Sequence, residues 1–246
     1  MKREGLFEAL GDVDEAYVEA ARTQKKHRTR LWIGAAAAAA CLALGLLLPR
    51  FLREAIPLSA DSKGAHVYYV NRTPQNYESS AVLIPLTEEE IFTHWDTAVF
   101  RGTVTQIRSI VMEVGGHDFY RAIAQIAVEE AYRGPLKAGD TASVLLPCPI
   151  SADGFWAEDS EVIAQLRPGM TGIFMPIVYT RENSFLSAGG ETLIQKDVAD
   201  FGLPDGVRFA FLETDHGVVY ARGEFPGLPD AQTLDEVAAY VRQMIG

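Results

Sequence analysis

The sequence predicts a mainly β domain, an antiparallel barrel or sandwich with two short helices, that follows one transmembrane α-helix. Three observations support this fold class. An uncharged apolar run extends from Trp32 to Leu48. Beyond Trp95, apolar and polar residues alternate with a period of two in several short segments. Turns that contain Gly or Pro separate these segments, as is typical of antiparallel β-structure.

The apolar run reads WIGAAAAAACLALGLLL and predicts a transmembrane helix over residues 31–52. Its 17 residues would span about 26 Å as a helix, and apolar neighbours on both sides extend this length toward the ~30 Å of a hydrocarbon core. The consecutive alanines favour helix formation. The leucines after Cys41 supply most of the energy of insertion.

Basic residues lie mainly on the N-terminal side of the predicted span. Those before the apolar run are Arg22, Lys25, Lys26, Arg28 and Arg30, and those after the run are Arg50, Arg53 and Lys63. The positive-inside rule therefore predicts a single-pass protein of the cell membrane, with its N-terminus in the cytoplasm and its C-terminal domain extracytoplasmic. The alternative is a cleaved signal peptide, but the basic region is unusually long and the apolar run exceeds a typical signal-peptide core.

Charge is divided unequally along the chain. Residues 1–30 have a net charge of +1, whereas residues 50–246 contain 15 basic and 27 acidic residues, a net charge of −12. An acidic domain repels phosphate backbones, so nucleic acid is not an expected partner. An acidic surface that serves only solubility is the alternative interpretation.

Cys41 and Cys148 cannot pair within one chain, because Cys41 lies in the apolar run, so we expect a fold without disulfides.

The cytoplasmic segment, residues 1–30, is predicted to be a helical leader. Leu6, Leu10, Val13 and Tyr17 recur at helical spacing and form one apolar stripe. Thirty residues cannot bury a core of their own. The stripe is therefore expected to contact a partner protein or the membrane, and a leader that serves only membrane insertion is the alternative.

The stretch LFEALGDVDEAYVEAA precedes a basic cluster and an alanine-rich span that ends in CLALGLLL. This pattern resembles the leader of anti-sigma-like, sigma-factor-associated membrane proteins of Firmicutes-type bacteria, over roughly residues 1–50. The zinc-binding motif of His and paired Cys found in many anti-sigma factors is absent from the sequence. The resemblance implies a sigma factor as cytoplasmic partner, contacted through Leu6, Phe7, Leu10, Val13 and Tyr17.

Residues 53–86 are predicted to be a linker in which His66 to Val70 forms an edge strand, and residues 87–246 are predicted to be the β domain. Capping boxes at Thr87–Glu90 and Thr233–Glu236 predict the two helices. The expected elements are a helix over 88–95, strands at Val99–Gln106, Tyr120–Tyr132, Thr141–Leu146, Gly172–Val178, Val207–Leu212 and Val218–Arg222, and a C-terminal helix with Val237, Tyr240, Val241 and Met244 on one face.

The segments VFRGTVTQI, IAVEEAYRGPLKAGDTASVLL and LRPGMTGIFMPIV resemble strands of OB-like barrels in bacterial surface proteins related to netrin and tissue-inhibitor modules. The resemblance covers about residues 97–180 and implies an OB-like barrel. Thr171-Gly172-Ile173 stands where the family has an aromatic residue. An all-β sandwich is the alternative fold.

Motifs of common enzymes are absent from the sequence: it has no nucleophile elbow, P-loop, dinucleotide fingerprint or metalloprotease helix. We therefore predict no catalytic residue, cofactor or metal, and expect that the protein is not an enzyme. His117-Asp118 and Asp215-His216 fall at predicted hairpin tips and would form a metal site only if the tips met, while ordinary turn chemistry explains them equally well. Cys148 is interpreted as a buried filler rather than a reactive thiol.

Phe155 and Trp156 are the best candidates for ligand-binding aromatic residues, and covering one end of the barrel is their alternative role. The leading hypothesis is a membrane-anchored protein whose outer domain binds a ligand or envelope component and whose leader regulates a sigma-factor-type partner. The first alternative is a surface hydrolase or metal-dependent enzyme. The second is a structural envelope protein.

Overall fold

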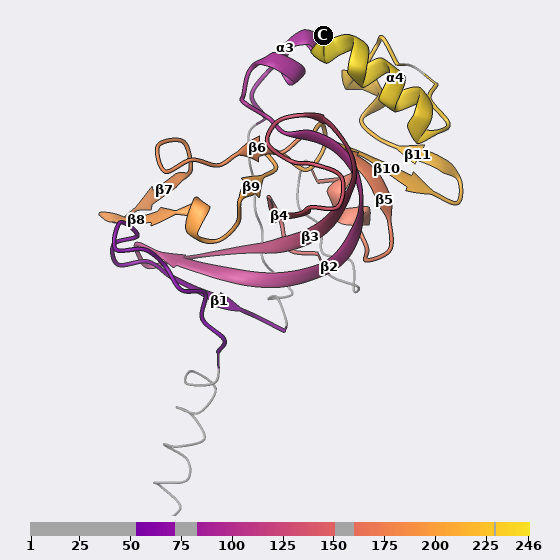
Figure 1. The fold of residues 1–246 in the computed structure, drawn as a ribbon. Helices are drawn as coiled ribbons and strands as arrows, with labels where there is room; N and C mark the ends of the chain where they lie inside the picture. Colours follow the sequence, from indigo (N-terminus) through magenta and orange to yellow (C-terminus); the bar gives the residue numbers. More distant parts are fainter. Residues whose placement is uncertain (1–52, 72–82, 151–159, 229) are drawn as a thin grey trace, which may run out of the picture. The chain divides into compact units, whose positions relative to one another are not determined.

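The computed structural model describes residues 53–71, 83–150, 160–228 and 230–246 (Figure 1). From Glu54 onward these residues form one compact unit. The leader predicted at residues 1–30 and the span predicted at residues 31–52 lie outside the described residues. Within the part of the chain that is described, no helix is long and apolar enough to cross a membrane.

The unit is mainly β, with a curled half-barrel sheet and two α-helices. The strands are β1 (His66–Tyr69), β2 (Val99–Val114), β3 (His117–Arg133), β4 (Thr141–Leu146), β5 (Thr171–Phe174), β6 (Ile177–Val178), β7 (Phe185–Ala188), β8 (Glu191–Ile194), β9 (Phe201–Gly202), β10 (Ala210–Thr214) and β11 (Gly217–Val219). The helices are α3 (Glu88–Thr93) and α4 (Leu234–Ile245), with short 3₁₀ turns η1 (Ile163–Gln165), η2 (Gln195–Asp197) and η3 (Arg222–Glu224).

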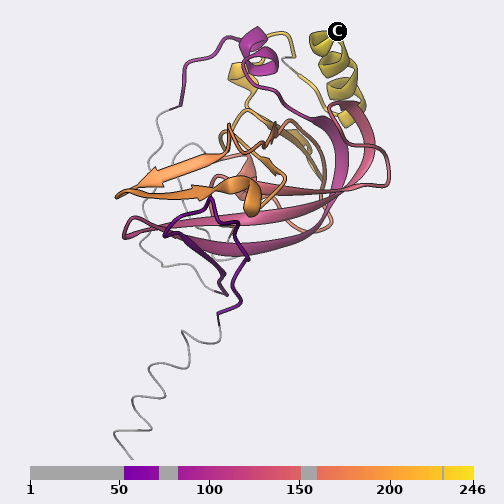
Figure 2. The same ribbon diagram turned by 60° about the vertical axis from the view of Figure 1, so that its left-hand side comes forward.

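The centre of the unit is the long hairpin of β2 and β3, which the sequence predicted as two shorter strands. The two strands pair antiparallel along their length, and their register shifts near Phe100, Gly102 and Thr105. Irregularities of this kind bend a strand and increase its twist, and Figure 2 shows the hairpin curling around the interior. Gly115 and Gly116 form the predicted turn with φ angles of 59° and 77°, a region that glycine enters without steric cost.

Further strands bring the sheet back to the start of the hairpin. β4 pairs antiparallel with β3, β9 pairs parallel with β4, and β6 pairs antiparallel with β9. Ile177 of β6 then forms a bridge with Thr97, directly before β2. Backbone hydrogen bonds of 2.9 Å from Ala98 N to Pro176 O and from Val178 N to Asp96 O extend this contact. The path β2–β3–β4–β9–β6 thus returns to its own beginning.

One predicted strand, Gly172–Val178, is divided into β5 and β6. Pro176 interrupts it, because proline has no N–H to donate to a neighbouring strand. β5 pairs with β10, and β6 pairs with β9, so the strand changes partners at the interruption. The last predicted hairpin is present as β10 and β11, but Arg222 lies in η3 rather than in the second strand.

Apolar residues are buried on both faces of the β2–β3–β4 sheet, in two clusters. Ala122 and Ala124 belong to the large interior cluster, whereas Ile123, between them, belongs to the second cluster with Leu145. Neighbouring residues of a strand point to opposite faces, which explains the division. The second cluster includes Leu193 of β8 and Val67 of β1, so these elements cover the outer face of the sheet.

Both predicted capping boxes are present. Thr87 caps α3, which ends at Thr93, two residues earlier than predicted, and Thr233 caps α4. The side chain of each threonine accepts a hydrogen bond from the backbone N–H of the Glu three residues later. α4 buries Val237 and Val241, as its apolar pattern predicted.

A glycine in the hairpin provides a test of this packing. Gly102 pairs with Gly172 of β5, and a Cβ on Gly102 would lie 2.4 Å from the carbonyl oxygen of Ala127. We expect Gly102→Ala to lower the free energy of unfolding by about 1–3 kcal/mol, because an overpacked core must shift its backbone. Urea denaturation of the full chain in detergent micelles measures this change.

Gly223→Ala is the matched control, since a Cβ at Gly223 would meet no atom within 4 Å. It should change the unfolding free energy by no more than about 0.5 kcal/mol. Equal stability of the two variants would contradict the close approach of β2 and β3 at Gly102.

Candidate functional site

Two groups of predicted binding residues lie outside the described residues. These are Phe155 and Trp156, proposed as ligand-binding aromatic residues, and the leader positions Leu6, Phe7, Leu10, Val13 and Tyr17, proposed as the contact with a sigma factor.

The structure does not bring the two His–Asp pairs together. His117 and Asp118 follow the β2–β3 turn, where Gly115 contacts the Gly189 backbone between β7 and β8. Asp215 and His216 form the turn between β10 and β11, on the opposite side of the unit (Figure 1). Among the described residues, no group of three or more His, Cys, Asp and Glu side chains is arranged to hold a metal ion. The site on which the hydrolase alternative depended therefore does not form from these four residues.

Cys148 is buried in the large interior cluster, with 3% of its surface exposed. Burial raises the pKa of its thiol to about 11, because an apolar surrounding disfavours the thiolate. A thiol with such a pKa is almost entirely protonated at neutral pH and is a poor nucleophile. The interpretation of Cys148 as a buried filler is confirmed.

One cavity of about 440 Å³ lies beside α3. It is lined by residues 83–87 and by the side chains of Glu90, Arg208 and Glu224. Arg208 is 3% exposed and forms a buried ion pair with Asp205 at 2.9 Å. Its guanidinium also donates a 2.9 Å hydrogen bond to the carbonyl oxygen of Ile84. Since the charge of Arg208 is already neutralised by Asp205, the cavity offers no strong site for an anion.

A second surface is formed by the exposed side of four adjacent strands, and we call it the polar face. Its first row crosses β5, β2, β3 and β4 in direct register, and its second row crosses β2, β3 and β4. The rows consist of Thr171, Thr103, Ala127 and Thr141, and of Gln106, Gln125 and Ser143.

The seven residues of the polar face are uncharged and rich in hydroxyl and amide groups, and at its edge Thr103 donates a hydrogen bond to the carboxylate of Glu129. Each of its seven residues is exposed or half-buried, whereas Val104, Ile126 and Ala142 on the same strands are buried in the interior cluster. Hydrogen bonds tie neighbours together: Thr103 to Thr171 at 2.8 Å and Gln125 to Ser143 at 3.2 Å. Such bonds hold the side chains in place and leave further donor and acceptor capacity for a ligand.

The N-terminal segment Glu54–Tyr69, which we call the strap, is attached to the outer sheet. It was expected to be a linker with an edge strand. That strand is present as β1, which pairs with residues 110–113 of β2. The residues before β1 also pair with it, through hydrogen bonds of 2.9 Å from Ile56 N to Val67 O and from Tyr69 N to Glu54 O.

Polar side chains fasten the strap at several points. Asp197 accepts three hydrogen bonds of 2.7–3.0 Å, from the N–H and hydroxyl of Ser59 and from the hydroxyl of Ser62. Burial raises the pKa of Asp197, but the hydrogen bonds from Ser59 and Ser62 outweigh this effect, so the pKa lies below its ordinary value. Arg108 of β2 donates hydrogen bonds from its two terminal guanidinium nitrogens to the two carboxylate oxygens of Glu54.

Comparisons of this chain with known protein families, with curated proteins and with solved structures find no match. Function must therefore be argued from the geometry.

The sequence alone predicted part of the polar face, because the alternation in β2 places Thr103 on an exposed side of that strand. The sequence did not predict that Gln125 and Ser143 belong to the same face. These residues lie beside Gln106 because of the strand register, and no local sequence pattern specifies that register.

Asp197→Asn tests the attachment of the strap. An amide keeps the size of the carboxylate but loses its charge, so we expect a loss of about 1–3 kcal/mol of unfolding free energy at pH 7. The folded-state pKa of Asp197 is lowered, so its contribution is present above the unfolded-state value and is lost as pH falls through the folded-state value. The difference from wild type should therefore disappear in acid. Urea denaturation across pH measures both effects.

Asp215→Asn, at the exposed β10–β11 turn, is the control and should leave stability almost unchanged. A stability loss for Asp197→Asn that persisted unchanged at acidic pH would show that the charge of Asp197 does not hold the strap.

Proposed function

We propose that this protein is a single-pass membrane protein without enzymatic activity, whose extracytoplasmic OB-like domain binds an uncharged glycan of the cell envelope. Its cytoplasmic leader, residues 1–30, contacts a sigma-factor-type partner. The predicted span at residues 31–52 joins the two parts.

The order of the strands supports an OB-like barrel. Counted from β2, the strands β2, β3, β4 and the interrupted strand β5–β6 follow one another in the chain, and in space the last of these four lies beside β2. The spatial order of these four strands is therefore fourth, first, second, third, which is the order of a Greek key. β9 adds a fifth strand that joins β4 to β6. A five-stranded Greek-key barrel is the architecture of OB folds.

The single observation that carries the ligand proposal is the row of uncharged polar residues on this face, within residues 50–246 whose net charge is −12. OB folds bind oligonucleotides or oligosaccharides on the face of their second and third strands, which are β3 and β4 in this chain. The acidic domain repels nucleic acid. An uncharged oligosaccharide, whose hydroxyl and amide groups match Gln125, Ser143 and their neighbours, is the ligand class that remains.

Replacing Gln106 by Glu tests the polar face. The substitution keeps the shape of the side chain but replaces its two amide donors by a carboxylate, which can only accept. We expect affinity for N-acetylglucosamine oligomers to fall by about tenfold or more, because a lost hydrogen bond to a buried ligand group costs about 1–3 kcal/mol. Calorimetric titration of the full chain in nanodiscs measures this affinity.

Gln243→Glu makes the same change at an exposed position of α4 and should bind like wild type. Equal losses in the two variants would indicate a general effect of charge. A wild-type chain that bound none of the uncharged oligosaccharides would favour the structural envelope protein.

The leader is tested by Leu10→Asp, which places a charge on the apolar stripe. We expect this variant to lose co-purification with a sigma factor after crosslinking in intact cells, while Thr23→Asp, outside the stripe, retains it. If the wild-type chain captures no sigma factor, the regulatory part of the proposal fails and the glycan-binding part stands.

A further inference from the structure

The polar face contains one apolar position. Ala127 of β3 lies between Thr103 of β2 and Thr141 of β4 in direct register, and its side chain is half-buried. Residues directly opposite one another in an antiparallel sheet lie on the same side of it. Gln125 and Glu129, each two residues away on β3, share that side. The methyl group of Ala127 is therefore surrounded by four longer polar side chains.

The hydrogen bonds on the β2 side of Ala127 have a fixed direction. A carboxylate only accepts hydrogen bonds, so the hydroxyl of Thr103 donates its single hydrogen to Glu129. The Thr103 hydroxyl must then accept in its 2.8 Å contact with Thr171. Its second lone pair and the exposed carboxylate of Glu129 remain as acceptors. Thr103 and Glu129 thus offer acceptors to a ligand.

Donors lie on the β4 side of Ala127. The side-chain nitrogen of Gln125 donates one hydrogen to Ser143 Oγ at 3.2 Å, and its second hydrogen remains. Thr141 is exposed, and its hydroxyl can rotate to donate. Acceptors and donors for a ligand thus lie on opposite sides of one methyl group.

An acetamido group matches this arrangement. The N–H and C=O of a trans amide point in opposite directions, and its methyl group lies between them. Directly opposed residues are roughly 5 Å apart, so Thr103 and Thr141 stand roughly 10 Å apart on either side of Ala127. This distance accommodates one amide with a hydrogen bond of about 3 Å at each end. The N–H then points to Thr103, the C=O points to Thr141, and the methyl group contacts Ala127.

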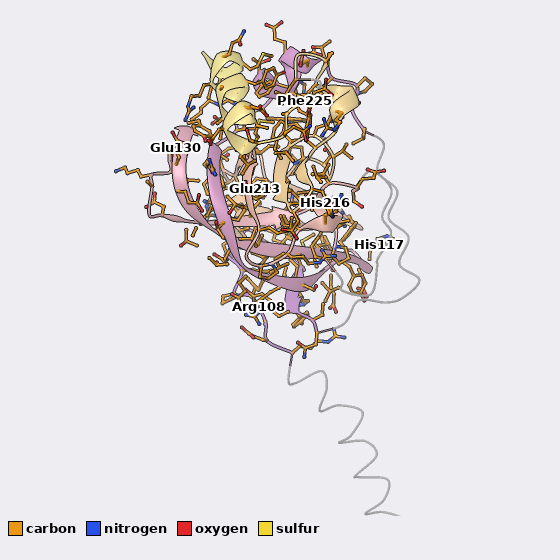
Figure 3. The ribbon with its side chains drawn as sticks, turned by 90° about the vertical axis from the view of Figure 1, so that its right-hand side faces the viewer. Arg108, His117, Glu130, Glu213, His216 and Phe225 are labelled. Carbon is orange, nitrogen blue, oxygen red and sulfur yellow. The ribbon has the colours of Figure 1, made fainter. Side chains whose placement is uncertain are left out.

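The charged residues at the two ends of the polar face are paired. Figure 3 shows Arg108 of β2 at one end of the unit and Glu130 of β3 toward the other. In the register of these strands, the polar face lies between the Arg101–Glu130 pair and Arg108. Arg101 is paired with Asp235 at 2.8 Å, and Arg108 is paired with Glu54. Since carboxylates already neutralise both arginines, a neutral acetamido group suits this face better than a carboxylate or phosphate substituent.

We propose that Ala127, with its four polar neighbours, forms an acetamido-binding subsite that makes the domain selective for N-acetylated sugars. This inference rests on the glycan-binding part of the proposed function. It adds which substituent of the sugar is recognised, and by which residues. A hydroxyl in place of the acetamido group is too short to reach both Thr103 and Thr141, and it leaves the Ala127 methyl group in contact with water.

Calorimetric titration of the full chain in nanodiscs tests the subsite with triacetylchitotriose, its deacetylated form chitotriose, and cellotriose. We expect triacetylchitotriose to bind wild type about tenfold or more tightly than the other two, because both lack the amide that joins the two sides. Ala127→Val keeps a residue that suits a strand but occupies the place of the acetyl methyl group, so it should remove most of this preference. Ala138→Val, in the exposed turn after β3, is the control and should retain it.

A second measurement needs no substitution. In saturation-transfer NMR of triacetylchitotriose with wild type, the acetyl methyl protons should receive the largest transfer, because they contact Ala127.

Four results would each overturn the subsite and leave glycan binding intact. These are equal affinity of wild type for triacetylchitotriose and cellotriose, tighter binding of deacetylated chitotriose, an unchanged preference in Ala127→Val, and larger saturation transfer to the ring protons. Absence of binding to all three oligosaccharides would instead overturn the glycan-binding function together with the subsite, so the two failures are distinguishable.

Discussion

The paired strands β2 and β3 are the constraint on which the rest of the unit depends. They run side by side for 16 and 17 residues, and bulges bend them near Gly102 and Thr105. The edge of β2 opposite β3 is divided between two partners, β5 along residues 100–103 and β1 along residues 110–113. One bent hairpin therefore organises the interior of the half-barrel sheet, the polar face and the attachment of the strap.

The outer side of this hairpin changes along its length, because other elements cover only one part of it. Near β5, the outer side carries Thr103 and Gln125 and is open to solvent. Near β1, the outer side carries Ile110 and Met112, which are fully buried beneath the strap and β7–β8. The change occurs between Gln106 and Arg108, so the polar face begins beside the residue that holds Glu54.

Local chemistry made some of these elements predictable. The capping boxes at Thr87 and Thr233, the Gly115-Gly116 turn and the boundaries of β4 follow from residues that are neighbours in sequence. β9 was not predicted, because two residues without a repeating pattern carry no periodic signal. The composition of the polar face and the burial of the strap depend on strand register and on partners distant in sequence, such as Asp197 for Ser59. A single sequence does not specify these pairings.

The parallel pairing of β4 with β9 has a consequence for how the domain forms. Val144 lies beside Phe201, so a segment of more than fifty residues separates strands that must meet before the ring is complete. Proteins dominated by such distant pairings fold slowly, because the entropy of ordering the intervening chain is lost before the contact is gained. The chain is synthesised from its N-terminus, so the hairpin can assemble early, but the edge of β4 stays open until Phe201 and Gly202 of β9 have been made. The growing chain must therefore be protected from aggregation during this interval.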